Sequence, residues 1–330
     1  MSHTVTISPV GQVFEVEGGD SILNAALKQG FVLKHGCRDG KCGDCRTRLV
    51  EGEVSYPDSV ELSDTDVSGS TVLTCQARPR SDITIHSPEV TGFKGVSIQK
   101  VAARVIGKEE LADDVVKITC KLAPGSVFNY LPGQYVDLTL KNQITRSYSL
   151  ATADAENGCI ELHIRLVPGG KATPVIFDDL QVKNIVTVEG PFGSFYLRES
   201  NAPAIFVASG TGFAPIKALM QQLIGQSAGT GKVHLYWGGR RREDLYMDSL
   251  CRQWAQELDW FQYTPVVSDD TESWNGRTGY VHAAVMNDYP DLSGYQVYAC
   301  GAPVVVDSSR EEFVARRQLQ LENFFADAFV

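Results

Sequence analysis

The chain has 330 residues, of which 43% are hydrophobic and 21% are charged. This composition excludes a disordered chain, and the length predicts two or three globular domains. Thirty basic and forty acidic residues give a formal net charge of −10. We therefore expect neither nucleic acid nor an anionic membrane as the main partner, because both require a positive protein surface.

The N-terminal sequence predicts a cytoplasmic protein. It has no apolar signal core, and no run of the chain reaches the roughly 18 apolar residues of a membrane-spanning helix, so we expect no membrane insertion. The chain contains eight cysteines. In a cytoplasmic protein these are expected to be metal ligands or free thiols rather than disulfides.

The first 90 residues predict a small domain of mixed strands and helix. Residues 5–7 and 13–16 form a predicted strand pair around a turn. A helix is predicted over residues 22–29, capped by Asp20 or Ser21 and ended by Gly30. A short predicted strand over residues 70–74 leads to Cys75.

Four cysteines are concentrated in this segment. Cys37, Cys42 and Cys45 follow a C-x4-C-x2-C pattern, and Cys75 follows after 29 further residues. This is the spacing by which plant-type ferredoxins bind a [2Fe–2S] cluster. Glycines in the loop allow the backbone to approach the cluster, and its N–H groups can stabilise the negative charge. Residues 1–90 therefore resemble a β-grasp ferredoxin domain with these four cysteines as metal ligands.

A zinc site is the main alternative for these thiols. Cys42 and Cys45 are spaced like one half of such a site, and His35 could add a ligand. Structural zinc usually has two close pairs of ligands, however, and Cys75 stands alone. Buried structural thiols are a second alternative, which the loop disfavours because it contains no apolar run.

A linker and a barrel are predicted next. Residues 91–98 contain two glycines and lack periodicity, which indicates a linker. Residues 99–200 carry short strands separated by turns, which predicts an antiparallel barrel. The predicted strands cover residues 102–106, 115–120, 134–140, 147–151, 160–166 and 186–189.

The polar motifs of this barrel suit a flat, phosphorylated cofactor. The Arg146 guanidinium can donate two parallel hydrogen bonds to a phosphate. Tyr148 can stack on a flat ring, and a serine can hydrogen-bond the edge of that ring. Each motif alone is ordinary for a strand or a turn, but their ordered set is not. The predicted cofactor-binding residues are Arg146, Ser147, Tyr148, Ser149, His163, Arg165, Gly170, Lys171, Ala172 and Thr173.

Residues 201–330 alternate between strands and helices, which predicts an α/β domain with a parallel sheet. Gly210, Thr211 and Gly212 join the predicted strand over 204–208 to a helix whose first N–H groups can bind phosphate. The motif is not G-x-G-x-x-G. Further strands are predicted over residues 233–237, 262–267 and 296–299.

Two further motifs lie at expected strand ends of this domain. Cys300 and Gly301 follow the last predicted strand, and ligands bind at the carboxyl ends of strands in such sheets. Arg240, in a run of three arginines, could bind the 2′-phosphate of NADPH or belong to a solvated loop. The aromatic tail that includes Phe329 could be ordinary core.

The order of motifs LPGQY, RSYS, HIR, GGKAT, EGPFG, SGTGFAP, YWGGR and YACGAP resembles that of the ferredoxin–NADP⁺ reductase-like flavoproteins. Together with the N-terminal cysteine motif, it resembles the iron–sulfur flavoprotein reductases over almost the whole chain. Within them the likeness is greatest to CDP-6-deoxy-Δ3,4-glucoseen reductases, including the ending FFADAF. The resemblance implies a [2Fe–2S] cluster, FAD and NAD(P)H as cofactors.

The resemblance also implies individual roles. Arg146 would meet the FAD diphosphate, which Gly170 and Thr173 would also contact, and Tyr148 would stack on the isoalloxazine. The predicted catalytic residues are Ser149, which would lie near flavin N5, and Cys300, which would lie near nicotinamide C4. Phe329 would cover the flavin. NADH-using relatives often keep an arginine at the position of Arg240, so we expect NADH, with NADPH as the alternative.

The implied activity is an NAD(P)H-dependent reductase that passes electrons from NADH through FAD and the [2Fe–2S] cluster to an acceptor protein. We expect the acceptor to be a deoxysugar dehydrase or, alternatively, a component of a ring-hydroxylating or other oxygenase. A redox sensor without turnover is the alternative of another class. We expect the chain to be monomeric on its own, with a docking patch formed by Arg38, Lys41, Arg46 and Arg48.

Overall fold

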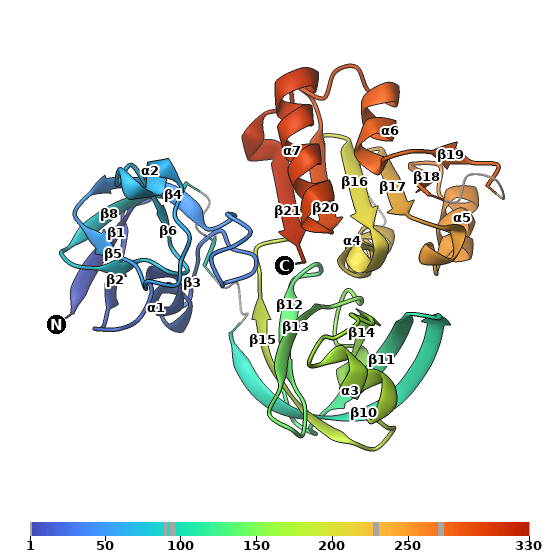
Figure 1. The fold of residues 1–330 in the computed structure, drawn as a ribbon, viewed down its shortest axis with the longest axis horizontal. Helices are drawn as coiled ribbons and strands as arrows, with labels where there is room; N and C mark the ends of the chain where they lie inside the picture. The colour runs from blue at the N-terminus through green and yellow to red at the C-terminus, as the bar shows by residue number, and fades with distance from the viewer. Residues whose placement is uncertain (1, 89–90, 93–96, 227–230, 270–273, 330) are drawn as a thin grey trace. The chain divides into compact units, whose positions relative to one another are not determined.

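The computed structural model describes residues 2–88, 91–92, 97–226, 231–269 and 274–329 (Figure 1). The chain divides into two compact units. The first consists of Met1–Ile98 together with Phe192–Ser194, and the second of Gln99–Pro191 and Phe195–Phe329.

The first unit is built on a five-stranded sheet with the order β2-β1-β8-β4-β6. Strands β1 and β8 are parallel, and the other neighbours in this sheet are antiparallel. Helix α1 begins after Ser21, whose side chain caps Asn24 N–H, so the predicted helix is confirmed. The bounds are β1 His3–Ser8, β2 Gln12–Val16, α1 Ile22–Lys28, β3 Phe31–Val32, β4 Arg46–Glu51, β5 Val54–Ser55, α2 Asp64–Val67, β6 Thr71–Leu73, β7 Arg78–Pro79, β8 Ile83–His86 and β9 Thr91–Gly92.

The predicted linker lies partly outside the described residues, which omit 93–96. Its first two residues, Thr91–Gly92, form β9 and pair with β3. The linker and domain boundaries of the sequence analysis remain a prediction.

The first part of the second unit is a six-stranded sheet with the order β13-β12-β15-β10-β11-β14. A bridge between Leu150 and Leu162 joins the end of β13 to β14, which closes the sheet toward a barrel. All six predicted strands are present. The bounds are β10 Gln99–Ala112, β11 Val115–Leu122, β12 Tyr135–Thr139, β13 Thr145–Ser149, η1 Glu156–Gly158, β14 Cys159–Arg165, α3 Thr173–Asp178 and β15 Ile185–Phe192.

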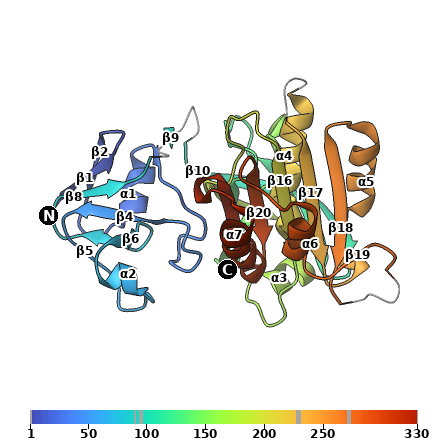
Figure 2. The same ribbon diagram turned by 90° about the horizontal axis from the view of Figure 1, so that it is seen from above.

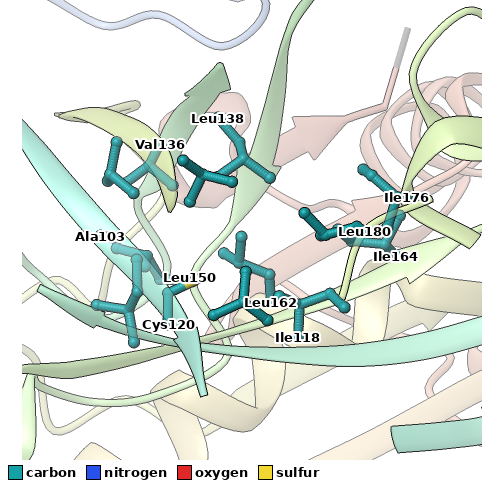
Figure 3. Close-up of a cluster of buried hydrophobic side chains, with 14 of the residues drawn as sticks. Ala103, Ile118, Cys120, Val136, Leu138, Leu150, Leu162, Ile164, Ile176 and Leu180 are labelled. Atoms are coloured by element: carbon teal, nitrogen blue, oxygen red, sulfur yellow. The ribbon is translucent and has the colours of Figure 1, made fainter. Parts of the chain in front are cut away.

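The barrel core explains which residues of β14 face outward. Ile160, Leu162 and Ile164 are buried among the apolar side chains of the barrel. Figure 3 shows Leu162 and Ile164 in this cluster. Because side chains alternate along a strand, Glu161, His163 and Arg165 must share the opposite face. The sequence motif HIR thus contributes polar side chains outside the core.

The rest of the second unit is a parallel sheet with the order β19-β18-β17-β16-β20-β21. Helices α4 and α5 cover one of its faces and α6 and α7 the other (Figure 2). The predicted parallel sheet is confirmed. The bounds are β16 Ala204–Ser209, η2 Gly210–Gly212, α4 Phe213–Gly225, β17 Val233–Gly239, η3 Arg242–Asp244, α5 Asp248–Glu257, β18 Phe261–Val267, β19 Arg277–Thr278, α6 Val281–Asp288, β20 Gln296–Gly301, α7 Pro303–Arg317, η4 Leu321–Asn323 and β21 Phe324–Ala328.

Strand order brings distant motifs together in this sheet. Strand β16 lies between β17 and β20, so Ser209, Gly239 and Gly301 end neighbouring parallel strands at the same edge. The aromatic tail forms β21, which pairs with β20 in parallel. Within the described ranges, no helix is both long enough and apolar enough to cross a membrane.

Candidate functional site

The four predicted cluster cysteines of the first unit form two pairs, one of which is set by strand pairing. Cys45 immediately precedes β4 and Cys75 follows β6, and these strands pair at Arg46 and Leu73. The sulfur atoms of Cys45 and Cys75 are consequently 3.2 Å apart. Cys37 and Cys42 form a second pair, in which each backbone N–H donates to the other sulfur at 3.4 Å.

Within each pair the local chemistry favours one thiolate, the form that ligates iron, while the hydrogen bond between the thiols and burial raise the pKa of the partner thiol, Cys42 or Cys45. A hydrogen bond from Cys42 lowers the pKa of Cys37 to about 7. The hydrogen bond from Cys45 likewise lowers the pKa of Cys75. Gly40 and Gly43 have φ values of +89° and +76°, a conformation that side chains disfavour, so the loop requires glycine there. Two thiol pairs on such a loop fit a cluster in which each iron takes two cysteine ligands.

His35, the ligand of the alternative zinc site, is occupied by backbone contacts. It is 2% exposed, and its Nδ1 lies 2.7 Å from the carbonyl oxygen of Leu33. Its Nε2 accepts the N–H of Gly193 at 2.9 Å, which implies that Nδ1 carries the proton. Neither ring nitrogen is available to zinc in this arrangement.

The RSYS motif forms most of β13 in the second unit. Arg146 is exposed, and Ser147 Oγ donates to Asp137 at 2.7 Å. Burial raises the pKa of Tyr148 to about 12, and its buried hydroxyl has no hydrogen-bond partner within the residues described. A buried hydroxyl usually has a partner, so Tyr148 fits a strand surface that a polar aromatic group such as FAD covers.

The GGKAT motif leads into helix α3. Thr173 begins the helix, and its Oγ1 accepts the N–H of Val167 at 2.9 Å, which closes the preceding turn. A Cβ on Gly170 would lie 3.0 Å from the Val167 carbonyl oxygen, so the turn favours glycine. Lys171 is exposed and Ala172 is the cap residue. The role of this turn toward a diphosphate remains a prediction.

His163 and Arg165 point toward the α/β domain. Both ring nitrogens of His163 have partners, Glu161 Oε1 at 2.9 Å and the Tyr246 hydroxyl at 3.1 Å. The Arg165 guanidinium pairs with Asp244 at 2.9 Å and with Asp114 at 3.2 Å. The roles of His163 and Arg165 toward FAD remain predictions.

The predicted phosphate-binding turn packs directly against the other nicotinamide motif. Gly210–Gly212 leads from β16 into α4, and a Cβ on Gly212 would collide with the carbonyl oxygen of Cys300. A Cβ on Gly301 would collide with Ser209. Thr211 lies in the same turn. Only glycine permits this close approach of the two strand ends.

A carboxylate that the sequence did not predict joins the two candidate catalytic residues. Asp327 on β21 is 6% exposed, and its Oδ2 accepts a hydrogen bond from Ser149 Oγ at 3.0 Å. The same oxygen lies 3.9 Å from Cys300 Sγ. Burial, together with the charge of Asp327, raises the pKa of Cys300 well above its usual value, so this thiol stays protonated. The polar residue within the apolar sequence FFADAF was the one signal for Asp327.

The remaining predicted residues lie near the same edge of the sheet. Phe329 N–H donates to the Gly301 carbonyl at 2.9 Å, and its side chain is 37% exposed. Arg240 follows β17, and its Nε lies 3.4 Å from Asp244. Asp244 is 8% exposed. Burial opposes its ionisation, but the charge of Arg165 and the backbone hydrogen bonds from Arg240 and Arg241 together outweigh burial and lower its pKa.

Comparison with known families identifies all three parts of the chain. The 2Fe-2S iron–sulfur cluster binding domain matches residues 5–80, the oxidoreductase FAD-binding domain residues 102–196, and the oxidoreductase NAD-binding domain residues 206–311. The three matches agree, in the same order, with the two thiol pairs, with the buried Tyr148 hydroxyl that has no partner among the described residues, and with the turn at Gly210–Gly212.

Similar proteins match over the full length. The chain is 37% identical to the CDP-6-deoxy-L-threo-D-glycero-4-hexulose-3-dehydrase reductase of Yersinia pestis, across 100% of this chain and 99% of the relative. It is 35% identical to the xylene/toluene monooxygenase electron transfer component XylA of Pseudomonas putida, across 99% and 93%. The crystal structure of the Amycolatopsis cytochrome P450 reductase GcoB has a TM-score of 0.83 at 29% identity, across 99% and 98%.

Geometry, domain matches and relatives agree on one class. The expected cofactors are confirmed as a [2Fe–2S] cluster, FAD and a nicotinamide dinucleotide. The expected NAD(P)H-dependent oxidoreductase activity is also confirmed. The chain belongs to the iron–sulfur flavoprotein reductases of the ferredoxin–NADP⁺ reductase-like family, which supply electrons to dehydrase or oxygenase partners.

Proposed function

We propose that the electron acceptor of this reductase is a 3-dehydrase that acts on a CDP-linked deoxyhexulose. The observation that carries the proposal is the full-length match to two Yersinia dehydrase reductases at 37% identity. The oxygenase reductase components match at 30–35%. An oxygenase component is the second candidate, because XylA approaches the dehydrase reductases in both identity and coverage.

Reconstitution separates the two acceptors. The holoenzyme is mixed anaerobically with NADH and with either a purified CDP-deoxyhexulose 3-dehydrase or a purified oxygenase component. The proposal predicts catalytic NADH oxidation with the dehydrase and its substrate. NADH oxidation that is faster with the oxygenase component would favour the second candidate.

The coenzyme is proposed to be NADH. Arg240, the residue expected to meet a 2′-phosphate, is already paired with Asp244 at 3.4 Å, and Asp244 also accepts the N–H groups of Arg240 and Arg241. An ionised carboxylate at this turn opposes a second negative group. Comparison of kcat/KM for NADH and NADPH tests this choice, and a preference for NADPH would contradict it.

Hydride transfer is proposed to occur beside Ser149, Cys300 and Asp327. FAD, when bound, would supply the chemistry that links a two-electron hydride donor to a one-electron cluster. Arg146 and the Gly170–Thr173 turn would hold the diphosphate, and Tyr148 would stack on the ring. Asp327 fixes the direction of the Ser149 hydroxyl by accepting a hydrogen bond from it.

Cys300 is proposed to act by contact rather than as a nucleophile. Its protonated thiol is 1% exposed and lies at the carboxyl end of β20. Such a thiol can line the nicotinamide site without attacking the ring, since the thiolate is the nucleophilic form. Cys300→Ala should slow flavin reduction by NADH because the contact is lost. A small alkylating agent should leave the activity of the wild-type protein unchanged, and inactivation of the wild type would contradict this role.

The acceptor is proposed to contact exposed basic residues near the cluster loop. Arg46 is engaged in a paired contact with Asp66 at 2.9 Å. Lys41 pairs with Asp39 at 3.3 Å, but this ion pair is more exposed than that of Arg46 with Asp66, and Arg48 is exposed. Lys41 and Arg48 are therefore the sharper candidates for the docking contact that the sequence indicated.

A further inference from the structure

An ion pair between a buried lysine and a partly buried glutamate joins the barrel to the first helix of the α/β domain, within the second unit. Lys217 on α4 is 6% exposed, and its Nζ donates to Glu161 Oε1 on β14 at 3.0 Å. The same ammonium donates to the carbonyl oxygen of Ala151 at 2.9 Å. Lysine is almost never fully buried unless it is paired, so this contact has a specific geometry. The hydride-transfer chemistry described above does not use it.

Both ends of this contact lie close to the proposed reacting groups. Ala151 stands two residues after Ser149, the last residue of β13. Helix α4 begins directly after Gly212, which packs against the carbonyl of Cys300. The Lys217 ammonium thus connects the segment that carries Ser149 with the helix that abuts Cys300.

A second route leads from Glu161 to the phosphate-binding turn. The ionised Glu161 carboxylate can only accept a hydrogen bond, so His163 Nε2 carries the proton. The buried His163 ring is neutral, and its Nδ1 therefore accepts a hydrogen bond from the Tyr246 hydroxyl. Tyr246 packs edge-on against Trp237 with the ring centroids 5.1 Å apart. Trp237 Nε1 donates to the Gly210 carbonyl at 3.0 Å.

The negative charge of Glu161 is maintained at neutral pH. Burial alone would raise the pKa of Glu161, but the hydrogen bond from His163 and the charge of Lys217 outweigh it and lower the pKa to about 2. Glu161 is therefore ionised, and it holds β14 to α4 through a charge-assisted bond. Such bonds are stronger and more directional than neutral ones.

We propose that Lys217 is a positioning residue for hydride transfer, which sets the spacing between the Ser149 and Cys300 sides of the site through Ala151 and Glu161. The proposal rests on the proposed function of Ser149 and Cys300. Hydride transfer needs its two reacting atoms roughly 3–3.5 Å apart, and a misplacement of about 1 Å can cost about 10²-fold in rate. A residue outside the cofactor contacts can therefore control the rate.

The test replaces Lys217 in the holoenzyme and measures flavin reduction by NADH in anaerobic rapid mixing. Lys217→Met should lower the limiting rate about 10- to 100-fold. The NADH concentration at half-saturation should change little, because the phosphate-binding turn and α4 belong to the same domain. Reduction of the flavin by dithionite, which needs no nicotinamide geometry, should keep its wild-type rate.

A double variant and a control separate positioning from stability. Glu161→Gln combined with Lys217→Met leaves no unpaired buried charge and should recover most of the wild-type thermal stability, while the limiting rate stays low. Lys108→Met is the matched control, because the Lys108 ammonium also binds two backbone carbonyls, those of Phe177 and Leu180, but within the barrel. It should leave the limiting rate unchanged.

Three outcomes are decisive. A double variant that is both stable and as fast as wild type would overturn the proposal, as would a Lys217→Met variant whose defect lies only in NADH affinity. If the double variant does not fold, Lys217→Arg tests the proposal instead. This variant keeps a cation at position 217, so it should recover at least part of the limiting rate that Lys217→Met loses. No recovery would contradict the proposal. A failure of the proposed function would instead appear in the wild type, as an absence of flavin reduction by NADH.

Discussion

Replacement of Asp327 should slow flavin reduction by NADH without loss of the bound cofactors. The Asp327 carboxylate accepts a hydrogen bond from Ser149 at 3.0 Å, and both residues are buried. A hydrogen bond to a charged group contributes about 1.5–3 kcal/mol. If the whole contribution is expressed in the transition state, Asp327→Ala lowers the limiting rate by about 10- to 150-fold.

Anaerobic rapid mixing with NADH, followed through the flavin absorbance, measures this rate. Asp327→Asn is the matched variant, because it keeps the size of the side chain and removes the charge. A double-mutant cycle with Ser149→Ala should show coupling, since either single change removes the same bond. Additive effects, or an Asp327→Ala variant as fast as wild type, would refute the role assigned to this carboxylate.

Three further predictions concern the first unit. Cys75→Ser should abolish the iron–sulfur absorbance and acceptor reduction while reduction of a small dye by NADH through the flavin persists; loss of the dye reaction as well would argue against the order of electron flow. Lys41→Glu with Arg48→Glu should slow acceptor reduction at unchanged dye reduction, and equal losses in both assays would contradict the docking surface. Burial opposes ionisation of Asp66, but the hydrogen bonds from Arg46 and two hydroxyls outweigh it and lower its pKa from 3.8 to about 2. The contribution of ionised Asp66 to folding stability is therefore complete above about pH 3.8 and is lost as the pH falls toward 2. The free energy of unfolding in urea should consequently depend less on acid pH in Asp66→Asn than in wild type. Parallel pH curves for the two proteins would contradict this role of Asp66.

The cluster loop and the strands of the barrel were predictable because their signals are local. Cys37, Cys42 and Cys45 lie within one loop, and their spacing alone implies the ligand geometry. The barrel strands alternate apolar and polar residues over short runs, so their period could be read directly.

Asp327 and Lys217 were not predictable, because their roles depend on pairing between distant segments. Asp327 contacts Ser149, 178 residues away in the sequence, and reaches it only because the tail adds to the sheet as the parallel strand β21. Lys217 is one of three polar residues on an otherwise apolar helix, with Gln221 and Gln222. Its partner Glu161 is 56 residues away and lies on the outer face of β14.

The central claim is that electrons from NADH reach the four-cysteine iron–sulfur centre only by way of the flavin. Its most direct test adds NADH anaerobically to purified protein of known iron, sulfide and flavin content and follows the low-temperature paramagnetic resonance signal of the reduced centre. The account predicts that the signal appears in holoprotein and is absent from flavin-depleted protein, in which dithionite still produces it. Protein that contains zinc in place of iron, or a centre that NADH reduces equally well without flavin, would contradict it.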